Sequence, residues 1–102
     1  MVVEWLRIPV PAALQADYLR HDTAIWTKTL ATQPGFLGKE VWRDVADPEI
    51  LHLVIRWESL DAWTSVPRAV LDAADAAFTK AVGTTYAVAD CLTYDILSAA
   101  PA

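Results

Sequence analysis

The sequence predicts an α+β domain in which a four-stranded antiparallel sheet carries two helices on one face. Two stretches with helical spacing of apolar residues separate four runs of strand length, and the resulting order is βαββαβ. The chain has 102 residues, the usual size of one domain. This order is the split βαβ arrangement of ferredoxin-like domains.

The first third of the chain predicts a strand, a long helix and a second strand. Residues 2–9 form a β-branched and aromatic run that ends at a proline, and prolines suit strand ends better than strand interiors. From residue 12 to about residue 32 the spacing is helical without internal proline or glycine, until Pro34-Gly35 ends the helix. Residues 36–44 then predict the second strand.

A hairpin and a short helical turn follow. Residues 45–49 are rich in turn formers and precede the apolar run 50–57, so the second and third strands are expected to form a hairpin. Ser59 is a candidate N-cap for a short turn that runs through Trp63.

The last third of the chain predicts a second helix and a fourth strand. A helix over residues 67–82 would begin at Pro67 and be closed by Gly83, which are residue types suited to those ends. Residues 85–97 predict a long last strand. The small residues 98–102 predict a frayed tail, so the single domain is expected to span residues 1–97.

The composition argues against several classes of function. The net charge is −5 and no cluster of Lys and Arg is present, so nucleic acid is not expected as a partner. Cys91 is the only cysteine and cannot form a disulfide within the chain, and no Cys/His cluster has the spacing of a metal site. Because no signal peptide and no apolar run of about 20 residues is present, we expect a soluble cytoplasmic protein without a membrane partner.

Both faces of the predicted sheet carry apolar residues. Along residues 50–57, one set of alternating positions comprises Leu51, Leu53, Ile55 and Trp57, and the other comprises His52, Val54, Arg56 and Glu58. Two helices cover only one face, so the second face predicts a sheet-to-sheet homodimer. If the first set faces the helices, His52, Arg56, Glu4 and Glu40 face the partner, where an ion-pair network or a group that titrates near neutral pH is expected.

Asp22 interrupts the apolar face of the first predicted helix. Apolar residues form one arc of that helix, and Asp22 falls at the centre of the arc formed by Leu14, Tyr18, Leu19, Ile25, Trp26 and Leu30. A buried carboxylate must be paired, protonated or hydrated. Asp22 is therefore a candidate catalytic acid or base, with a structural bond to Arg7, Tyr86 or a backbone amide as the alternative.

Several aromatic residues are candidates for ligand contact. Trp26 shares the arc of Asp22, and Tyr18 and Tyr86 could bring hydroxyl groups to the same space, with Trp63 packed from the short turn. Among the other aromatic residues, Trp5 and Trp57 are expected to pack under the helices. Cys91 is expected to be a buried small apolar residue.

Three segments carry a resemblance to a known family. Pro34-Gly35-Phe36-Leu37-Gly38, Val54-Ile55-Arg56-Trp57-Glu58-Ser59 and Asp61-Ala62-Trp63 resemble the turn and packing signatures of antibiotic-biosynthesis-monooxygenase-like proteins, which have the dimeric α+β barrel fold. Glu4-Trp5-Leu6, Asp22 with Trp26-Thr27, and Lys39-Glu40-Val41-Trp42 also look like a small branch of about this length. That second likeness implies no particular substrate.

The resemblance implies a function that the sequence can partly test. Haem-degrading members use an Asn on the first strand, a Trp after the Trp-Glu-Ser segment and a His on the second helix, and none of the three is present. The resemblance therefore implies a cofactor-independent monooxygenase that acts on a small aromatic or phenolic substrate, with Asp22 as the catalytic residue and Trp26, Tyr18, Trp63 and Tyr86 around the substrate. The alternatives are a non-catalytic small-molecule-binding or structural homodimer, and a cyclase or isomerase on the same fold.

Overall fold

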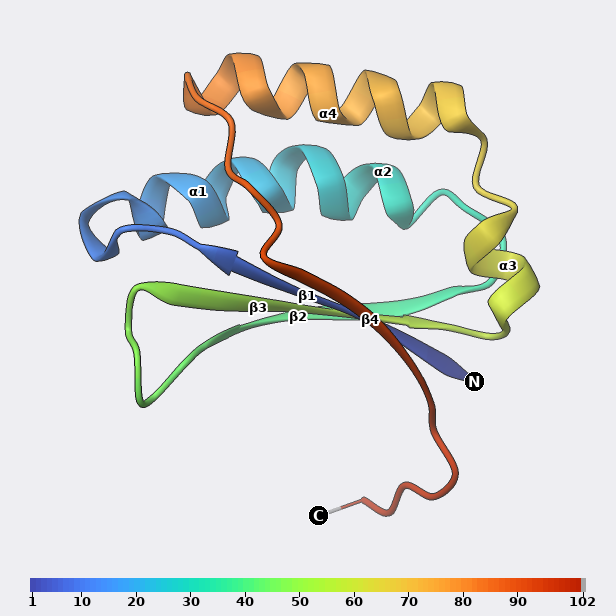
Figure 1. Ribbon diagram of the computed structural model, residues 1–102. Coiled ribbons are helices and arrows are strands. Elements are labelled where there is room, and N and C mark those ends of the chain that lie inside the picture. Colours follow the sequence, from blue (N-terminus) through green and yellow to red (C-terminus); the bar gives the residue numbers. More distant parts are fainter. Residues whose placement is uncertain (102) are drawn as a thin grey trace.

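The computed structural model describes residues 1–101 and consists of one antiparallel sheet with helices on one of its faces (Figure 1). The strands are β1 (Val2–Pro9), β2 (Phe36–Arg43), β3 (Ile50–Trp57) and β4 (Asp90–Asp95), and their order in the sheet is β2-β3-β1-β4. The helical segments are η1 (Ala12–Leu14), α1 (Gln15–His21), η2 (Asp22–Thr27), α2 (Lys28–Leu30), α3 (Leu60–Thr64) and α4 (Arg68–Val82). The predicted ferredoxin-like fold is confirmed.

The ends of several elements follow from single residues. The Ser59 hydroxyl accepts a hydrogen bond of 3.0 Å from the Ala62 amide and begins α3. Gly83 ends α4 with a φ of 80°, in the left-handed region that favours glycine. Gly35 also has a positive φ, and a Cβ at this position would collide with the side chain of Ala62. The turn before β2 therefore requires glycine, because α3 packs directly against it.

Two predicted elements differ from the observed ones. The first helix is not uniform, since it starts as a 3₁₀ turn, contains the π-helical segment η2 and ends at Leu30. The last strand covers only residues 90–95. Residues 84–89 leave the sheet and run past the helices, where the Tyr86 ring packs edge-to-face on Tyr18 with ring centroids 5.1 Å apart. In this segment the Ala89 amide donates to the Arg7 carbonyl of β1 at 2.8 Å, whereas Tyr86 packs on the helical layer.

The core lies between the helices and one face of the sheet. It consists of two clusters of buried side chains, one with Ile8, Val10, Tyr18, Leu51, Leu53 and Phe78 and the other with Val2, Leu30, Ile55 and Trp57. Trp57 is fully buried, as predicted. No helix within residues 1–101 is both long and apolar enough to span a membrane.

The register of β1 corrects two expectations about which face its residues occupy. Glu4 pairs with Ile55 and Trp5 pairs with Val54, and directly paired residues of antiparallel strands share a face. Glu4 therefore faces the helices and not a partner. Trp5 lies on the uncovered face, stacked on His52 with ring centroids 5.1 Å apart, instead of under the helices. Both expectations were wrong, because the alternation within β1 does not determine its register on β3.

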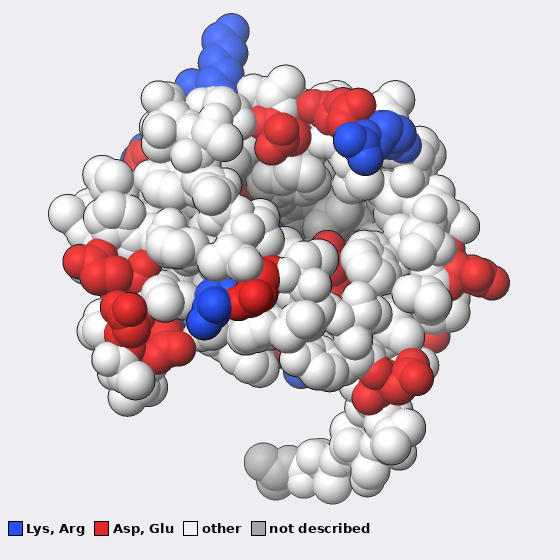
Figure 2. All heavy atoms as spheres, viewed as in Figure 1, with Lys and Arg blue, Asp and Glu red and all other residues white. Residues whose placement is uncertain are grey.

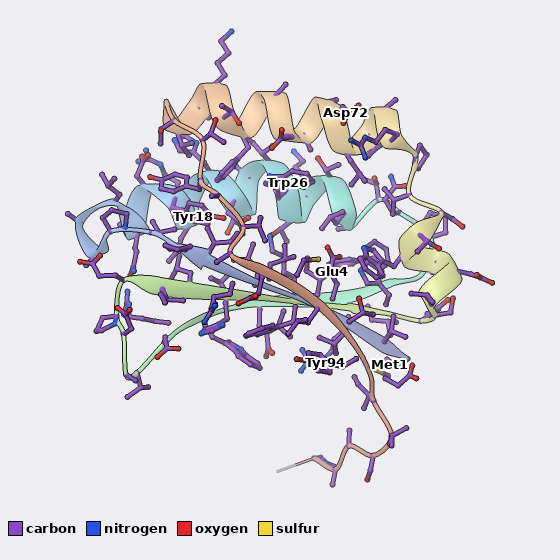
Figure 3. All side chains as sticks on the ribbon, viewed as in Figure 1. Met1, Glu4, Tyr18, Trp26, Asp72 and Tyr94 are labelled. Carbon is purple, nitrogen blue, oxygen red and sulfur yellow. The ribbon has the colours of Figure 1, made fainter. Side chains whose placement is uncertain are left out.

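The second face of the sheet, hereafter the open face, is uncovered in the single chain. Trp42, Leu92 and Tyr94 expose about half of their surface there, and Figure 3 shows Tyr94 below the sheet, away from the helices. The Arg56 guanidinium donates to Glu40 at 2.9 Å, and His52 lies 2.9 Å from Asp44. Cys91 is exposed on the edge strand β4, which corrects its predicted burial, because no element covers that edge.

Candidate active site

A cavity of about 290 Å³ lies between the helical layer and the sheet. Aromatic side chains from the helices, the sheet and residues 84–89 surround it, namely Tyr18, Trp26, Trp57, Trp63, Phe78 and Tyr86. In Figure 2 the surface is hollowed below α4 and above β4, which places an opening between these two elements. The volume lies at the small end of the range of about 300–1,000 Å³ for small-molecule sites. The space suits a compact ligand.

Two opposite charges stand on the sheet side of this apolar space. Glu4 on β1 and Lys39 on β2 are both paired with Ile55 of the strand between them, and all three residues line the cavity. Figure 3 shows Glu4 in the space between the sheet and the helices. Trp57 donates a hydrogen bond of 3.3 Å from its indole N–H to Oε1 of Glu4. Glu4 and Lys39 thus bring ionic groups to a surface that is otherwise mostly apolar.

Asp22 holds the ammonium group of Lys39. The distance from Lys39 Nζ to Asp22 Oδ2 is 2.7 Å, and the two side chains are only 2% and 1% exposed. The predicted alternatives for Asp22 named Arg7, Tyr86 or a backbone amide as partner, and the observed partner is instead Lys39, while Arg7 pairs with Asp90. The Oδ1 atom of Asp22 is buried without a hydrogen-bond partner within residues 1–101. Lys39 lines the cavity whereas Asp22 does not, so Asp22 is linked to the cavity through Lys39.

Burial changes the acidity of three groups around the cavity. Desolvation raises the pKa of Glu4, and the Trp57 hydrogen bond and the charge of Lys39 offset part of this rise. Desolvation likewise raises the pKa of Asp22, with Lys39 opposing it. Burial, together with the nearby Asp22 and Tyr86, raises the pKa of Tyr18, so its hydroxyl stays protonated. At neutral pH Tyr18 can therefore only act as a neutral hydroxyl.

The raised pKa of Glu4 predicts a pH-dependent effect of Glu4→Gln on stability. Because the pKa in the folded state lies above that in the unfolded chain, the contribution of Glu4 to stability is complete below the unfolded pKa of about 4.3 and is lost as pH rises through the folded value. Gln does not ionise. Urea unfolding should therefore show that the variant gains stability relative to wild type as the pH rises above the unfolded pKa of Glu4. A stability difference that stays constant as the pH rises would contradict the assignment.

The structure brings together most of the residues singled out in the sequence. Tyr18, Trp26, Trp63 and Tyr86 all line the cavity, whereas His52, Arg56 and Glu40 lie on the open face. Lys39 was not predicted as part of the site, although its position next to Glu40 in a strand already requires the two side chains to point to opposite faces. Within residues 1–101, no group of three or more His, Cys, Asp or Glu side chains is arranged to hold a metal ion.

Asp22 and Trp26 both belong to η2, the π-helical segment. Such segments are rare and occur often at functional sites, because the wider turn changes the direction in which side chains leave the helix. Here Trp26 lines the cavity while Asp22 pairs with Lys39 at its margin. The local departure from α-helical geometry coincides with the only charged residue buried on this helix.

An antiparallel sheet in the order β2-β3-β1-β4, with helices on one face and a cavity beneath them, defines a small ferredoxin-like α+β domain. The model of the antibiotic biosynthesis monooxygenase family matches residues 1–69, more than half of the chain. The chain therefore belongs to this family. No protein with a curated description matches it.

Solved structures from several bacteria share the fold. A candidate antibiotic biosynthesis monooxygenase of Bordetella bronchiseptica superposes with a TM-score of 0.74 at 20% identity, over 95% of this chain and 97% of that one. SnoaB, a cofactor-independent oxygenase from Streptomyces nogalater, superposes with a TM-score of 0.70 at 14% identity, over 99% of this chain and 97% of that one. A monooxygenase of Streptomyces coelicolor in complex with nanaomycin D superposes with a TM-score of 0.72 at 18% identity, over 99% of this chain and 91% of that one. At these identities the likeness establishes the shared fold.

Proposed function

We propose that this protein is a cofactor-independent monooxygenase that oxidises a small aromatic phenol in the cavity between the helices and the sheet. The observation that carries the proposal is the cavity itself, since aromatic walls surround a space with Glu4 and Lys39 on one side. Membership of the antibiotic biosynthesis monooxygenase family supports the reaction class. The two Streptomyces oxygenases that share the fold support it further.

The proposed reaction needs no electron donor besides the substrate. A phenol with a hydrogen on the ring carbon opposite its hydroxyl reacts with O₂ to give a quinone and water. One oxygen atom becomes the new carbonyl oxygen, and the other leaves as water with the phenolic hydrogen and the ring hydrogen. The protein would contribute by ionising the phenol and by excluding bulk water, because an ionised phenol gives up electrons to oxygen more readily than the neutral form.

Oxygen consumption with a panel of phenols, naphthols and anthrones tests this function. Wild type should consume one O₂ for each quinone formed. Val88→Trp should lower kcat/KM at least tenfold, because Val88 lines the cavity and is 49% exposed, so that a larger ring enters the space without disturbing the core. Val45→Trp is the matched control, because Val45 is 97% exposed in the turn between β2 and β3.

The outcomes separate the proposed function from its alternatives. Binding of panel members without any oxygen consumption would favour the non-catalytic binder. Conversion without oxygen consumption would favour a cyclase or isomerase. Equal activity of Val88→Trp and wild type would place the reaction outside this cavity.

We also propose that the protein is a homodimer formed by two open faces. Trp42, Leu92 and Tyr94 expose apolar surface that water does not favour, and the neighbouring ion pairs Arg56–Glu40 and His52–Asp44 supply polar groups beside it. The resemblance to antibiotic-biosynthesis-monooxygenase-like proteins, which have the dimeric α+β barrel fold, supports this assembly. A dimer would leave the cavity mouth between α4 and β4 free, because that mouth lies on the helical side of the sheet.

A further inference from the structure

Glu4 is the carboxylate that the structure places in the cavity. It lines the space, and its Oε1 atom accepts the indole N–H of Trp57, whereas Oε2 takes part in no hydrogen bond found within residues 1–101. Because Oε2 is also not among the buried atoms that lack a partner, it is accessible to a molecule in the cavity. Asp22 differs on both points, since it is bonded to Lys39 and does not line the cavity.

The remaining ionisable groups of the cavity are less suited to accept a proton. Tyr18 is a buried neutral hydroxyl, and its ring is held between Phe78 and Tyr86. Asp75 belongs to α4 and is exposed to solvent, so a proton placed there is shared with bulk water. Glu4 alone combines access to the cavity with protection from solvent.

Lys39 supplies the complementary charge. Its Nζ is held by Asp22 at 2.7 Å and is nearly inaccessible to solvent, and its side chain lines the cavity beside Ile55, opposite Glu4. An ammonium group carries three hydrogens, so the bond to Asp22 leaves donors for a second partner. Because Lys39 lines the cavity, an oxygen atom of a bound ligand is a candidate for that partner.

We propose that Glu4 accepts the hydroxyl proton of the bound phenol and that Lys39, positioned by Asp22, pairs with the phenolate that results. The inference rests on the proposed function, in that it takes the cavity as the phenol site. The O–H bond breaks, the proton moves to Oε2 of Glu4, and the electron pair stays on the phenol oxygen. Asp22 is a positioning residue, because it acts through Lys39.

The charge balance of the cluster favours this transfer. Before it, Glu4 and Asp22 are negative and Lys39 is positive, and the phenol is neutral. After it, Glu4 is neutral and the phenolate carries the negative charge, so no additional net charge is created in the apolar space. Burial disfavours the ionised form of Glu4, which makes Glu4 a better proton acceptor than an exposed carboxylate.

Binding of 4-nitrophenol tests the proton transfer without requiring oxygen. Above the pKa of free 4-nitrophenol the ligand enters as a phenolate, and Glu4 must then take up one proton from water. The Kd should therefore rise about tenfold per pH unit for wild type between about pH 8 and about pH 9. Glu4→Gln cannot take up the proton, so its Kd should change less than twofold over the same interval. Asp72→Asn is the matched control, because Asp72 is an exposed carboxylate of α4 that does not line the cavity, and it should behave as wild type.

Comparison with 4-nitroanisole, which has no acidic hydrogen, tests the role of the cation. Lys39→Met should raise the Kd of 4-nitrophenolate at least tenfold and change the Kd of 4-nitroanisole by less than about twofold, because only the anion needs the ammonium group. Lys39→Arg keeps the charge and should retain most of the preference for the anion. Asp22→Asn should also lower the preference for the anion, whereas a purely structural role of Asp22 would weaken both ligands equally.

The two proposals fail in different ways. No binding of 4-nitrophenol, or a wild-type Kd that does not change with pH, would overturn the assignment of Glu4 even if oxygen is consumed. If Lys39→Met loses affinity for 4-nitrophenolate and 4-nitroanisole equally, the assignment of Lys39 is overturned. If the Kd of 4-nitrophenol shows the predicted pH dependence but no phenol of the panel causes oxygen consumption, the result would support the acid–base site and contradict the monooxygenase function.

Discussion

Asp22→Ala is expected to lower the free energy of unfolding by about 3–5 kcal/mol. The substitution removes the carboxylate that lies 2.7 Å from Lys39 Nζ and leaves an ammonium group that is only 2% exposed without its counter-ion. Removing one member of a buried ion pair costs more than the pair itself contributes, because the other charge stays desolvated. Urea unfolding followed by tryptophan fluorescence measures the loss.

Two control variants separate this effect from a general loss of packing. Asp17→Ala removes the partner of Arg20 in an exposed pair, with side chains 47% and 71% exposed, and should cost less than about 1 kcal/mol. The double variant Asp22→Leu with Lys39→Met replaces both charges by apolar groups and should recover most of the loss. A double variant as unstable as Asp22→Ala would show that the ionic contact is not the cause.

Leu92→Glu is expected to convert the proposed homodimer into monomers. Leu92 is 43% exposed on β4 and lies in register with Trp5 on the open face, so a carboxylate at this position would be desolvated in a sheet-to-sheet interface. The other subunit of the homodimer carries the same substitution. A buried unpaired charge or a like-charge contact in an interface costs several kcal/mol. Sedimentation equilibrium measures the shift in dissociation constant.

The helical side of the molecule provides the matched control for the interface. Leu14 is 45% exposed in η1, nearly the same as Leu92, but it belongs to the layer that covers the other face of the sheet. Leu14→Glu should leave the dimer intact. Dissociation by both variants, or by neither, would place the contact elsewhere.

The structural and catalytic interpretations of Asp22 are both consistent with a loss of stability. Asp22→Ala alone therefore does not decide between the two interpretations, because in either case it leaves the buried Lys39 without its counter-ion. The decisive measurement compares how folded Asp22→Asn binds 4-nitrophenolate and 4-nitroanisole. A role in positioning Lys39 predicts that only the binding of 4-nitrophenolate is weakened. Lys39 is the group that connects Asp22 to the cavity, because it pairs with Asp22 and lines the cavity.

The arrangement of elements could be predicted because it depends on local patterns. The proline and glycine positions, the capping residue Ser59 and the alternation in β3 each specify an element without knowledge of its neighbours. The order of those elements then leaves few topologies for the sheet. The burial of Asp22 was predictable for the same reason, because a helical arc depends only on spacing along one helix.

The contents of the site depended on contacts between elements far apart in the chain. The partner of Asp22 lies on a different strand, and its position is determined by the register of β2 on β3, including the irregularity between Phe36 and Gly38. In the same way, the register of β1 on β3 turned Glu4 toward the cavity and Trp5 away from it. A shift of one residue in a strand moves every side chain to the opposite face.

Patterns local to the sequence were thus sufficient to predict the fold class, the order of strands and helices, and a carboxylate beneath the first helix. The tertiary contacts were needed to place Glu4 and Lys39 in one cavity with Trp26 and Tyr86, and to pair Asp22 with Lys39. The physical reason is that local spacing specifies each element, whereas register and packing between elements decide which face each side chain occupies.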